Sequence, residues 1–172
     1  MKSYPLIVAI IIAQWSGVAF ARDIVFSLPS KVRVEIIELP FDKAQFTISG
    51  CDKHSAICLI NGRIPFGSDL TLPKTYVKGI TVSYRGKSYS LNSSDMFNAW
   101  GERPLEINGI RYFGGECFDV RNCRFRGIFS DAAGTFVAEW MVVDGVSVRT
   151  VLTNSSDVES LFLRHIDPPW FK

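Results

Sequence analysis

The 172-residue sequence contains few of the residues, and none of the short motifs, on which catalysis most often depends. It has only two histidines, His54 and His165. The nucleophile pattern Gly-x-Ser-x-Gly, the phosphate-binding P-loop and the zinc pattern His-Glu-x-x-His do not occur in it. The sequence therefore predicts no catalytic residue and no cofactor, and the interpretation leans against an enzyme.

An excess of charge of one sign is also missing. One of the 19 basic residues, Lys2, lies in the apolar N-terminal segment Met1–Ala21, which leaves 18 basic against 17 acidic residues in the rest of the chain. A chain with so small a net charge has no extended field with which to attract a polyanion. The composition therefore predicts neither a nucleic-acid partner nor capture by a charged membrane surface.

Long apolar runs are limited to the N-terminus. The run Leu6–Ala13 follows a lysine and precedes the small-x-small cleavage pattern Ala19–Ala21, so Met1–Ala21 is predicted to be a cleavable signal peptide. A transmembrane anchor is the weaker alternative, because the run stops at Gln14, short of the roughly 20 residues that span a bilayer. We expect a single mature domain, Arg22–Lys172, that is periplasmic or secreted and not stably inserted in a membrane.

Cysteine is scarce, and the four cysteines occur as two close pairs, Cys51 with Cys58 and Cys117 with Cys123. Disulfides are the default in an oxidising compartment. Of the three possible connectivities, the local pairing within each region is the simplest, and a cross-linked pairing between the regions is the alternative. His54 lies between the first two cysteines and resembles part of a zinc site, but three local ligands are too few, so no metal is predicted.

The strongest structural signal that is present is a β-hairpin within Gly134–Leu152. Asp144-Gly145 lies between two β-branched runs, and both residues tolerate the positive φ of a two-residue turn. That turn predicts one face with the pairs Val143/Val146, Met141/Val148, Glu139/Thr150 and Val137/Leu152. Because three of these pairs are apolar, this face is predicted to be the core, rather than the face that carries Trp140 and Arg149.

Three further two-residue turns, Asn61-Gly62, Arg85-Gly86 and Asn108-Gly109, predict further hairpins. The pairs that they imply are Leu59/Ile64 and Ile57/Phe66, Ile80/Leu91 and Val82/Tyr89, and Ile107/Ile110 and Leu105/Tyr112. Alternation also predicts strands at Ile24–Leu28, Lys31–Leu39 and Gln45–Ser49, and a bulge near Gly79.

Two helices are predicted among the strands. Ser93–Asp95 precedes a short central helix, Met96–Trp100, and Ser156 with Glu159 forms a capping box for a C-terminal helix that ends near His165. In that helix Val158, Leu161, Phe162 and Ile166 have the spacing to dock on a sheet. The predicted fold is mainly β with a minor α+β character. It is a single antiparallel β-sandwich or partly open barrel built from hairpins, with a short central helix and a C-terminal helix packed on the sheet.

Several polar clusters are candidate sites, each with an ordinary structural interpretation. Loop acids that could supply a catalytic pair are Asp42, Asp52, Asp69, Asp95, Glu102, Glu116, Asp119 and Asp131, although solvated loop acids are common. Gly114-Gly115 with Arg121, Arg124 and Arg126 resembles a phosphate site. Arg124 and Arg126 share a strand face and Arg121 points the other way, so a solvent-facing strand edge is the favoured interpretation.

Large side chains outside the predicted elements are candidates for partner binding. Trp100, Arg103 and Trp170 are of the types that anchor interfaces, although the two tryptophans would be equally ordinary in a core, where Phe171 is placed. The favoured function is that of a non-enzymatic binding protein of the immunity or inhibitor type, which occludes one protein partner, a toxin or an envelope hydrolase. The alternatives are an envelope-polymer hydrolase that uses loop carboxylates and a structural surface or pilus-type subunit.

Overall fold

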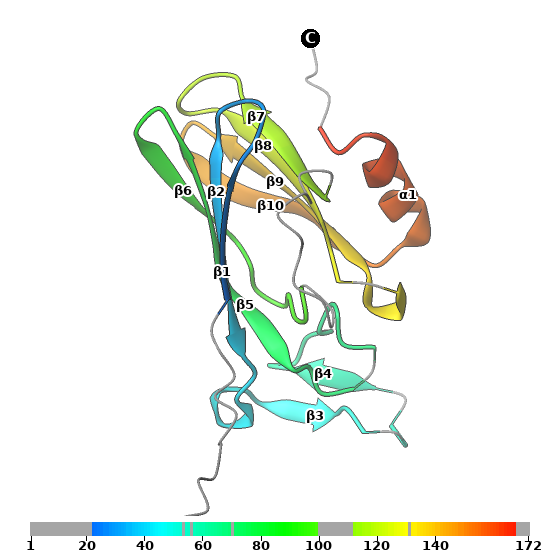
Figure 1. The fold of residues 1–172 in the computed structure, drawn as a ribbon. Coiled ribbons are helices and arrows are strands. Elements are labelled where there is room, and N and C mark those ends of the chain that lie inside the picture. The colour runs from blue at the N-terminus through cyan, green and yellow to red at the C-terminus, as the bar shows by residue number, and fades with distance from the viewer. Residues whose placement is uncertain are drawn as a thin grey trace, which may run out of the picture.

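Two four-stranded antiparallel sheets face each other in the computed structural model, which describes residues 22–52, 54–55, 57–69, 71–99, 112–130 and 132–167 (Figure 1). The first sheet has the order β1-β2-β5-β6, with β1 (Arg22–Ser27), β2 (Arg33–Pro40), β5 (Thr75–Tyr84) and β6 (Lys87–Leu91). The second has the order β10-β9-β8-β7, with β7 (Phe113–Cys117), β8 (Cys123–Phe129), β9 (Phe136–Val143) and β10 (Val146–Thr153). The remaining elements are β3 (Ile48–Gly50) paired with β4 (Cys58–Ile60), the 3-10 turns η1 (Lys43–Gln45) and η3 (Ala132–Gly134), and the helix α1 (Ser156–Arg164). The predicted antiparallel β fold is confirmed, and the sheets form a sandwich rather than a closed barrel.

The first sheet follows the sequence pattern closely. Val32, Val34 and Ile36 alternate along the chain and are all fully buried. The Arg85-Gly86 turn gives the predicted register, with Ile80 opposite Leu91. The predicted bulge is also present, because the pairing of β2 with β5 shifts by one residue next to Gly79.

In the second sheet, the buried face of the β9–β10 hairpin differs from the predicted one. The register is confirmed from the turn as far as Arg149, where a bulge shifts the following pairs by one residue. The predicted core face does not face the other sheet: Val143, Val146 and Val148 are 49%, 64% and 51% exposed and Val137 is buried beneath α1, whereas Trp140 is fully buried between the sheets. Large aromatic side chains bury far more apolar area than valines do, so the face with Phe136 and Trp140 turns inward.

An aromatic cluster fills the space between the two sheets. The Phe113 ring stacks on Trp140 with centroids 6.0 Å apart, and Phe129 meets the same indole edge-on at 6.2 Å. The Trp140 Nε1–H donates to the backbone oxygen of Asn92 at 2.9 Å, which satisfies the one polar atom of that side chain. This bond also ties β9 to the end of β6, where the two sheets adjoin.

The C-terminal helix lies on the outer face of the second sheet, as predicted (Figure 1). Phe162 is buried in a cluster with Ile128 and Val137, whereas Leu161 is 42% exposed and does not dock. The predicted capping box is not formed, because Ser155 rather than Ser156 is the N-cap and its side chain makes no capping hydrogen bond. Among the described residues, the structure contains no helix with both the length and the apolar surface that a membrane crossing requires.

The short central helix is not formed. Met96 and Phe97 instead make isolated bridges with Phe66 and Tyr76, and the Val77 N–H donates to the backbone oxygen of Met96 at 2.9 Å. Asp95 has a positive φ of 67°, which does not fit a helix start. The backbone groups of this segment are paired across the fold rather than within one turn. Trp100 lies outside the described residues.

The local disulfide connectivity is confirmed, with bonds between Cys51 and Cys58 and between Cys117 and Cys123. The first bond removes both thiolates of the zinc-like pattern around His54. Two disulfides indicate an oxidising, extracellular or periplasmic environment.

The Asn61-Gly62 turn is present, but the predicted strand pairing beyond it is not. Ile60 pairs with Arg63 across the turn, after which the chain leaves the ladder. Ile57 and Ile64 are 61% and 64% exposed, and Phe66 pairs with Met96 instead of Ile57. The Asn108-Gly109 hairpin lies outside the described residues.

Candidate functional site

Four turns meet at one end of the sandwich, and we call this surface the turn end (Figure 1). It consists of residues 28–32 between β1 and β2, 84–87 between β5 and β6, 117–123 between β7 and β8, and 143–146 between β9 and β10. Side chains join the two sheets here. The Ser30 Oγ donates to the backbone oxygen of Gly115 at 2.8 Å, and the Tyr89 hydroxyl donates to that of Val120.

The β7–β8 loop is closed by the Cys117–Cys123 disulfide and ordered from within by Asp119. The Asp119 carboxylate accepts from the backbone N–H groups of Arg121 and Asn122 at 2.7 and 2.9 Å, and from the Asn122 side-chain amide. The pKa of Asp119 is lowered below its usual value. The hydrogen bond from the Asn122 side chain contributes most to this shift, followed by the hydrogen bond from the Arg121 backbone N–H. The carboxylate therefore organises the loop rather than serving as an acid.

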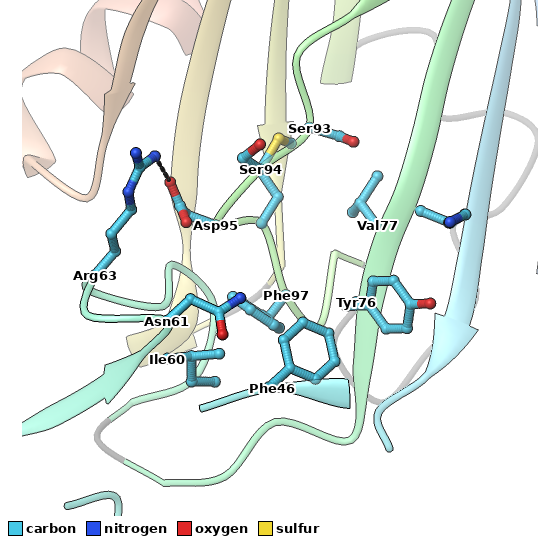
Figure 2. Close-up of a pocket in the computed structure, with 12 residues that line it drawn as sticks. Phe46, Ile60, Asn61, Arg63, Tyr76, Val77, Ser93, Ser94, Asp95 and Phe97 are labelled. Atoms are coloured by element: carbon cyan, nitrogen blue, oxygen red, sulfur yellow. Dashed lines mark hydrogen bonds and ion pairs between the residues drawn. The ribbon is translucent and has the colours of Figure 1, made fainter. Parts of the chain in front are cut away.

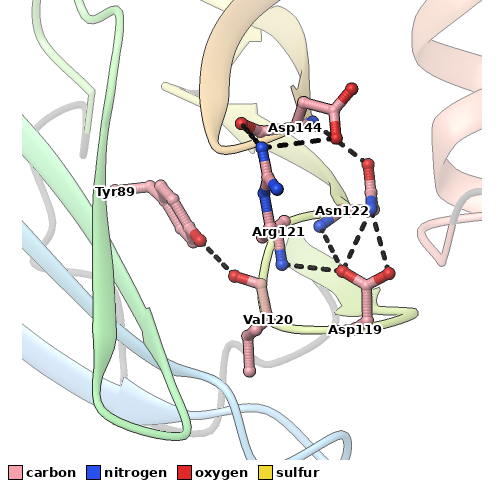
Figure 3. Close-up of polar contacts among 6 residues, drawn as sticks. All are labelled: Tyr89, Asp119, Val120, Arg121, Asn122 and Asp144. Atoms are coloured by element: carbon pink, nitrogen blue, oxygen red, sulfur yellow. Dashed lines mark hydrogen bonds and ion pairs between the residues drawn. The ribbon is translucent and has the colours of Figure 1, made fainter.

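Contacts with the neighbouring turn hold the same loop from outside (Figure 3). The Gly145 N–H donates to the backbone oxygen of Arg121 at 2.8 Å. The Arg121 guanidinium contacts both the backbone oxygen and the carboxylate of Asp144, at 3.1 and 3.5 Å. The Asp144 N–H donates to the Asn122 side chain at 3.1 Å. The two loops therefore form one connected unit.

This ordered unit displays apolar side chains to solvent. Phe118, directly after the first cysteine of the loop, is 78% exposed. Val143, Val146 and Val148 lie on the outer face of the adjoining hairpin and are about half exposed or more, at 49%, 64% and 51%. Apolar groups on a scaffold that is already ordered are suited to recognition, because little conformational entropy is lost when a partner binds.

Basic side chains outnumber acidic ones at the turn end. Lys31, Arg85, Lys87 and Arg121 are all exposed there, against the two acids Asp119 and Asp144. Arg121 and Asp144 pair with each other, and Asp119 is engaged within its own loop. The four turns together therefore carry more basic than acidic side chains, which favours an acidic partner.

Several of the loop acids considered for a hydrolase make contacts that give them structural roles. Asp42 caps η1, Asp52 accepts from the His54 N–H, and Asp95 forms ion pairs with Arg63 and Arg149. Asp69 and Glu116 are exposed, and Glu102 and Asp131 lie outside the described residues. Asp119, and the buried Glu139 outside the loops, have a shifted pKa. Both pKa values are lowered, the opposite of what a general acid needs.

Two of the arginines that suggested a phosphate site bind groups of the protein itself. Arg124 and Arg126 share a face of β8, as predicted. The prediction that they lie on a solvent-facing strand edge is wrong, because β8 is an inner strand of its sheet. Both contact the Glu139 carboxylate, at 3.2 and 2.6 Å. Arg126 also donates to the backbone oxygen of His165 at 2.8 Å and stacks over Phe162. These charges join α1 to the sheet, and the C-cap of that helix is formed by the His165 backbone.

The glycines beside those arginines allow a close approach of the C-terminal segment. A Cβ on Gly114 would lie 2.7 Å from the Asp167 carboxylate and 2.9 Å from the backbone oxygen of Ile166. The neighbouring Gly115 N–H donates to the same carboxylate at 3.0 Å. The glycine pair therefore has a packing role in the structure.

Replacing Gly114 by alanine is expected to lower the free energy of unfolding by about 1 to 3 kcal/mol, because the new methyl group would push Ile166 and Asp167 away from β7. Gly79→Ala is the matched control, since an added Cβ there meets no atom within 4 Å. Its effect should stay within about 0.5 kcal/mol. Urea denaturation of the two variants gives both values, and equal values would contradict the packing role of Gly114.

The other candidate partner-binding residues, Trp100, Arg103 and Trp170, lie outside the described residues, as does Phe171. Phe118 was not among the predicted binding residues, because the sequence around it indicated only the Cys117–Cys123 disulfide. An aromatic residue next to a cysteine in so short a loop has little room to reach a core, and this was the sequence feature that could have indicated its exposure.

The chain matches no protein family, no characterised protein and no solved structure in comparisons with known proteins.

Proposed function

We propose that this protein is an exported, non-enzymatic binding protein of the immunity or inhibitor type. Its turn end would enter the active-site cleft of a toxin or envelope hydrolase and block access to substrate. The signal-peptide pattern of Met1–Ala21 and the two disulfides support a periplasmic or secreted location.

The observation that carries the proposal is the 78% exposure of Phe118 on a loop held by a disulfide, an internal carboxylate and a neighbouring turn. Aromatic anchors that fill a pocket supply much of the binding energy of protein interfaces. A rigid projecting loop fits a concave surface, and an active-site cleft is the concave surface whose occlusion inhibits an enzyme. The excess of basic side chains at the turn end complements the carboxylates of many hydrolase clefts.

Phe118→Asp is expected to weaken partner binding by about 100-fold or more, because it removes the anchor and adds a charge that repels an acidic cleft. Ile64→Asp is the matched control, since Ile64 is also an exposed apolar residue, at 64%, and lies on the Asn61-Gly62 side of the fold rather than at the turn end. The tagged mature domain and both variants are used to capture partners from an envelope extract, and mass spectrometry identifies the bound proteins.

The proposal requires one stoichiometric enzyme partner that is captured by the wild type and by Ile64→Asp but not by Phe118→Asp. The purified wild-type domain must also inhibit that enzyme at an equimolar ratio. Unchanged thermal unfolding of Phe118→Asp shows that its fold is intact. Capture without inhibition, or full binding by Phe118→Asp, would overturn the proposal.

A further inference from the structure

A cavity of about 500 Å³ lies beside the small β3–β4 sheet (Figure 2), and that sheet lies away from the turn end (Figure 1). Its volume falls within the range of about 300 to 1,000 Å³ that is typical of small-molecule sites. In Figure 2, Arg63 and Asp95 stand on one side of the cavity, and the rings of Phe46 and Tyr76 stand together on the other. The lining of the cavity is therefore charged on one side and apolar on the other.

The charged side holds more positive than negative charge. Arg63 contacts the Asp95 carboxylate oxygen Oδ2 at 3.2 Å, and Arg149 contacts the same oxygen at 3.7 Å. Lys78 also lines the cavity. Two guanidinium groups thus share a single carboxylate oxygen, which leaves a net positive charge beside Asp95 that would favour an added anion.

The two guanidinium groups differ in how much freedom they have. Arg149 is not among the lining residues; its side chain is only 13% exposed and also donates to the backbone oxygen of Ser94 at 2.5 Å, so it is held in place. Burial lowers the pKa of the Arg149 guanidinium; the Asp95 carboxylate opposes that shift, and the nearby charge of Arg63 adds to it. Arg63 is 67% exposed and keeps several N–H groups directed to water. Arg63 is therefore the group that can turn to a ligand.

The apolar side is built from aromatic rings held against one another. Phe46 packs edge-on against Tyr76 at 5.3 Å and against Phe97 at 6.0 Å. The nearby Asn61 turn is fixed as well, since its side-chain oxygen accepts from the Thr47 N–H at 2.9 Å. A ring or a branched apolar group could therefore pack against Phe46 without rearrangement of the wall.

We propose that this cavity binds a small organic anion in which a carboxylate is joined to an aromatic or branched apolar group. The carboxylate would accept hydrogen bonds from Arg63, and the apolar group would lie against Phe46 and Tyr76. The site is separate from the turn end and does not rest on the proposed inhibitor function, so the failure of either leaves the other in place.

The test uses N-acetylphenylalanine, which carries a carboxylate and a phenyl ring, together with its neutral amide and acetate. Titrations are followed by isothermal calorimetry and by the amide NMR signals of Asn61 and Ser94. We expect saturable binding of N-acetylphenylalanine, with the amide and acetate each weaker by about tenfold or more, because each lacks one half of the recognised group.

Arg63→Met keeps much of the side-chain length and removes the charge, and it should weaken binding of N-acetylphenylalanine by about tenfold or more. Arg33→Met is the matched control, because Arg33 is similarly exposed, at 58% against 67%, and lies on another surface beside Glu35. That variant should bind as the wild type does. The proposal is overturned if no saturable binding is found, if the amide binds as tightly as the acid, or if both arginine variants bind equally well.

Discussion

Replacing Glu139 by glutamine is expected to lower the free energy of unfolding by about 3 to 5 kcal/mol. The Glu139 side chain is 6% exposed and accepts from Arg126 at 2.6 Å, from Arg124 at 3.2 Å and from the Thr150 hydroxyl at 3.0 Å. The two guanidinium groups are themselves only 9% and 11% exposed. Removal of the anion would leave two buried cations close together without the charge that compensates them.

Glu35→Gln is the control for this change. Glu35 also faces an arginine, Arg33, but at 3.7 Å and with a side chain that is 40% exposed. Exposed ion pairs contribute about 0 to 1 kcal/mol, so the control should unfold almost as the wild type does. Chemical denaturation at neutral pH measures both variants. A loss below about 1 kcal/mol for Glu139→Gln would show that the charges under α1 do not hold the helix to the sheet.

The pH dependence gives a second readout for Glu139. Burial, the largest single effect, raises the pKa of Glu139, but the hydrogen bonds from Arg126, Arg124 and Thr150 outweigh it, and the net shift is downward. A carboxyl group with a lowered pKa stabilises the fold above its unfolded pKa, near 4.5, and that contribution is lost as the pH falls toward the folded value. The stability difference between the wild type and Glu139→Gln should therefore be full at pH 6 to 7 and shrink below about pH 4.5. Asp119 titrates in both proteins and cancels from this difference.

Trp140→Ala is expected to lower the free energy of unfolding by about 3 to 5 kcal/mol, enough to unfold much of a marginally stable domain. The indole is fully buried against Phe113 and Phe129, and the surrounding rings cannot fill the space that it leaves. The backbone oxygen of Asn92 also loses the indole N–H as a donor. Thermal unfolding followed by near-ultraviolet circular dichroism measures the loss.

Val148→Ala serves as the control on the opposite face of the same hairpin. Val148 is 51% exposed, so its truncation should cost less than about 0.5 kcal/mol. The pair of variants measures which face of β9 and β10 is buried. A larger loss for Val148→Ala than for Trp140→Ala would return the core to the face that the sequence pattern favoured.

Strand pairing was predictable beside two of the tight turns, although at Asn61-Gly62 the turn formed without the predicted ladder beyond it. Arg85-Gly86 and Asp144-Gly145 have the positive φ values that two-residue hairpins need, and the ladders beside them follow the predicted register. The alternation of Val32, Val34 and Ile36 likewise identified a strand with one buried face. These are short-range effects, so the residues that cause them lie close together in the sequence.

Predictions that depended on distant neighbours were less successful. The segment at Met96 has the capping residues of a helix, yet its backbone groups pair with Phe66 and Val77, which are far from it in sequence. The sequence around Arg124 and Arg126 predicted a solvent-facing strand edge, because no neighbouring residue indicates that they contact Glu139 and the end of α1. The binding role proposed for Phe118 depends on contacts between its loop and the Asp144 turn, which is distant in sequence.

The local chemistry of the chain determined by itself the antiparallel hairpins, the two short disulfides and the presence of a C-terminal helix. Turn geometry, cysteine spacing and side-chain periodicity act over a few residues, so no knowledge of the rest of the fold is needed. The tertiary structure alone decided which face of β9 and β10 is buried, where the cations of β8 find their anion, and which residues meet at the turn end and in the cavity. Each of these depends on whether water or another part of the chain covers a surface, because burial and charge pairing arise between residues that only the fold brings together.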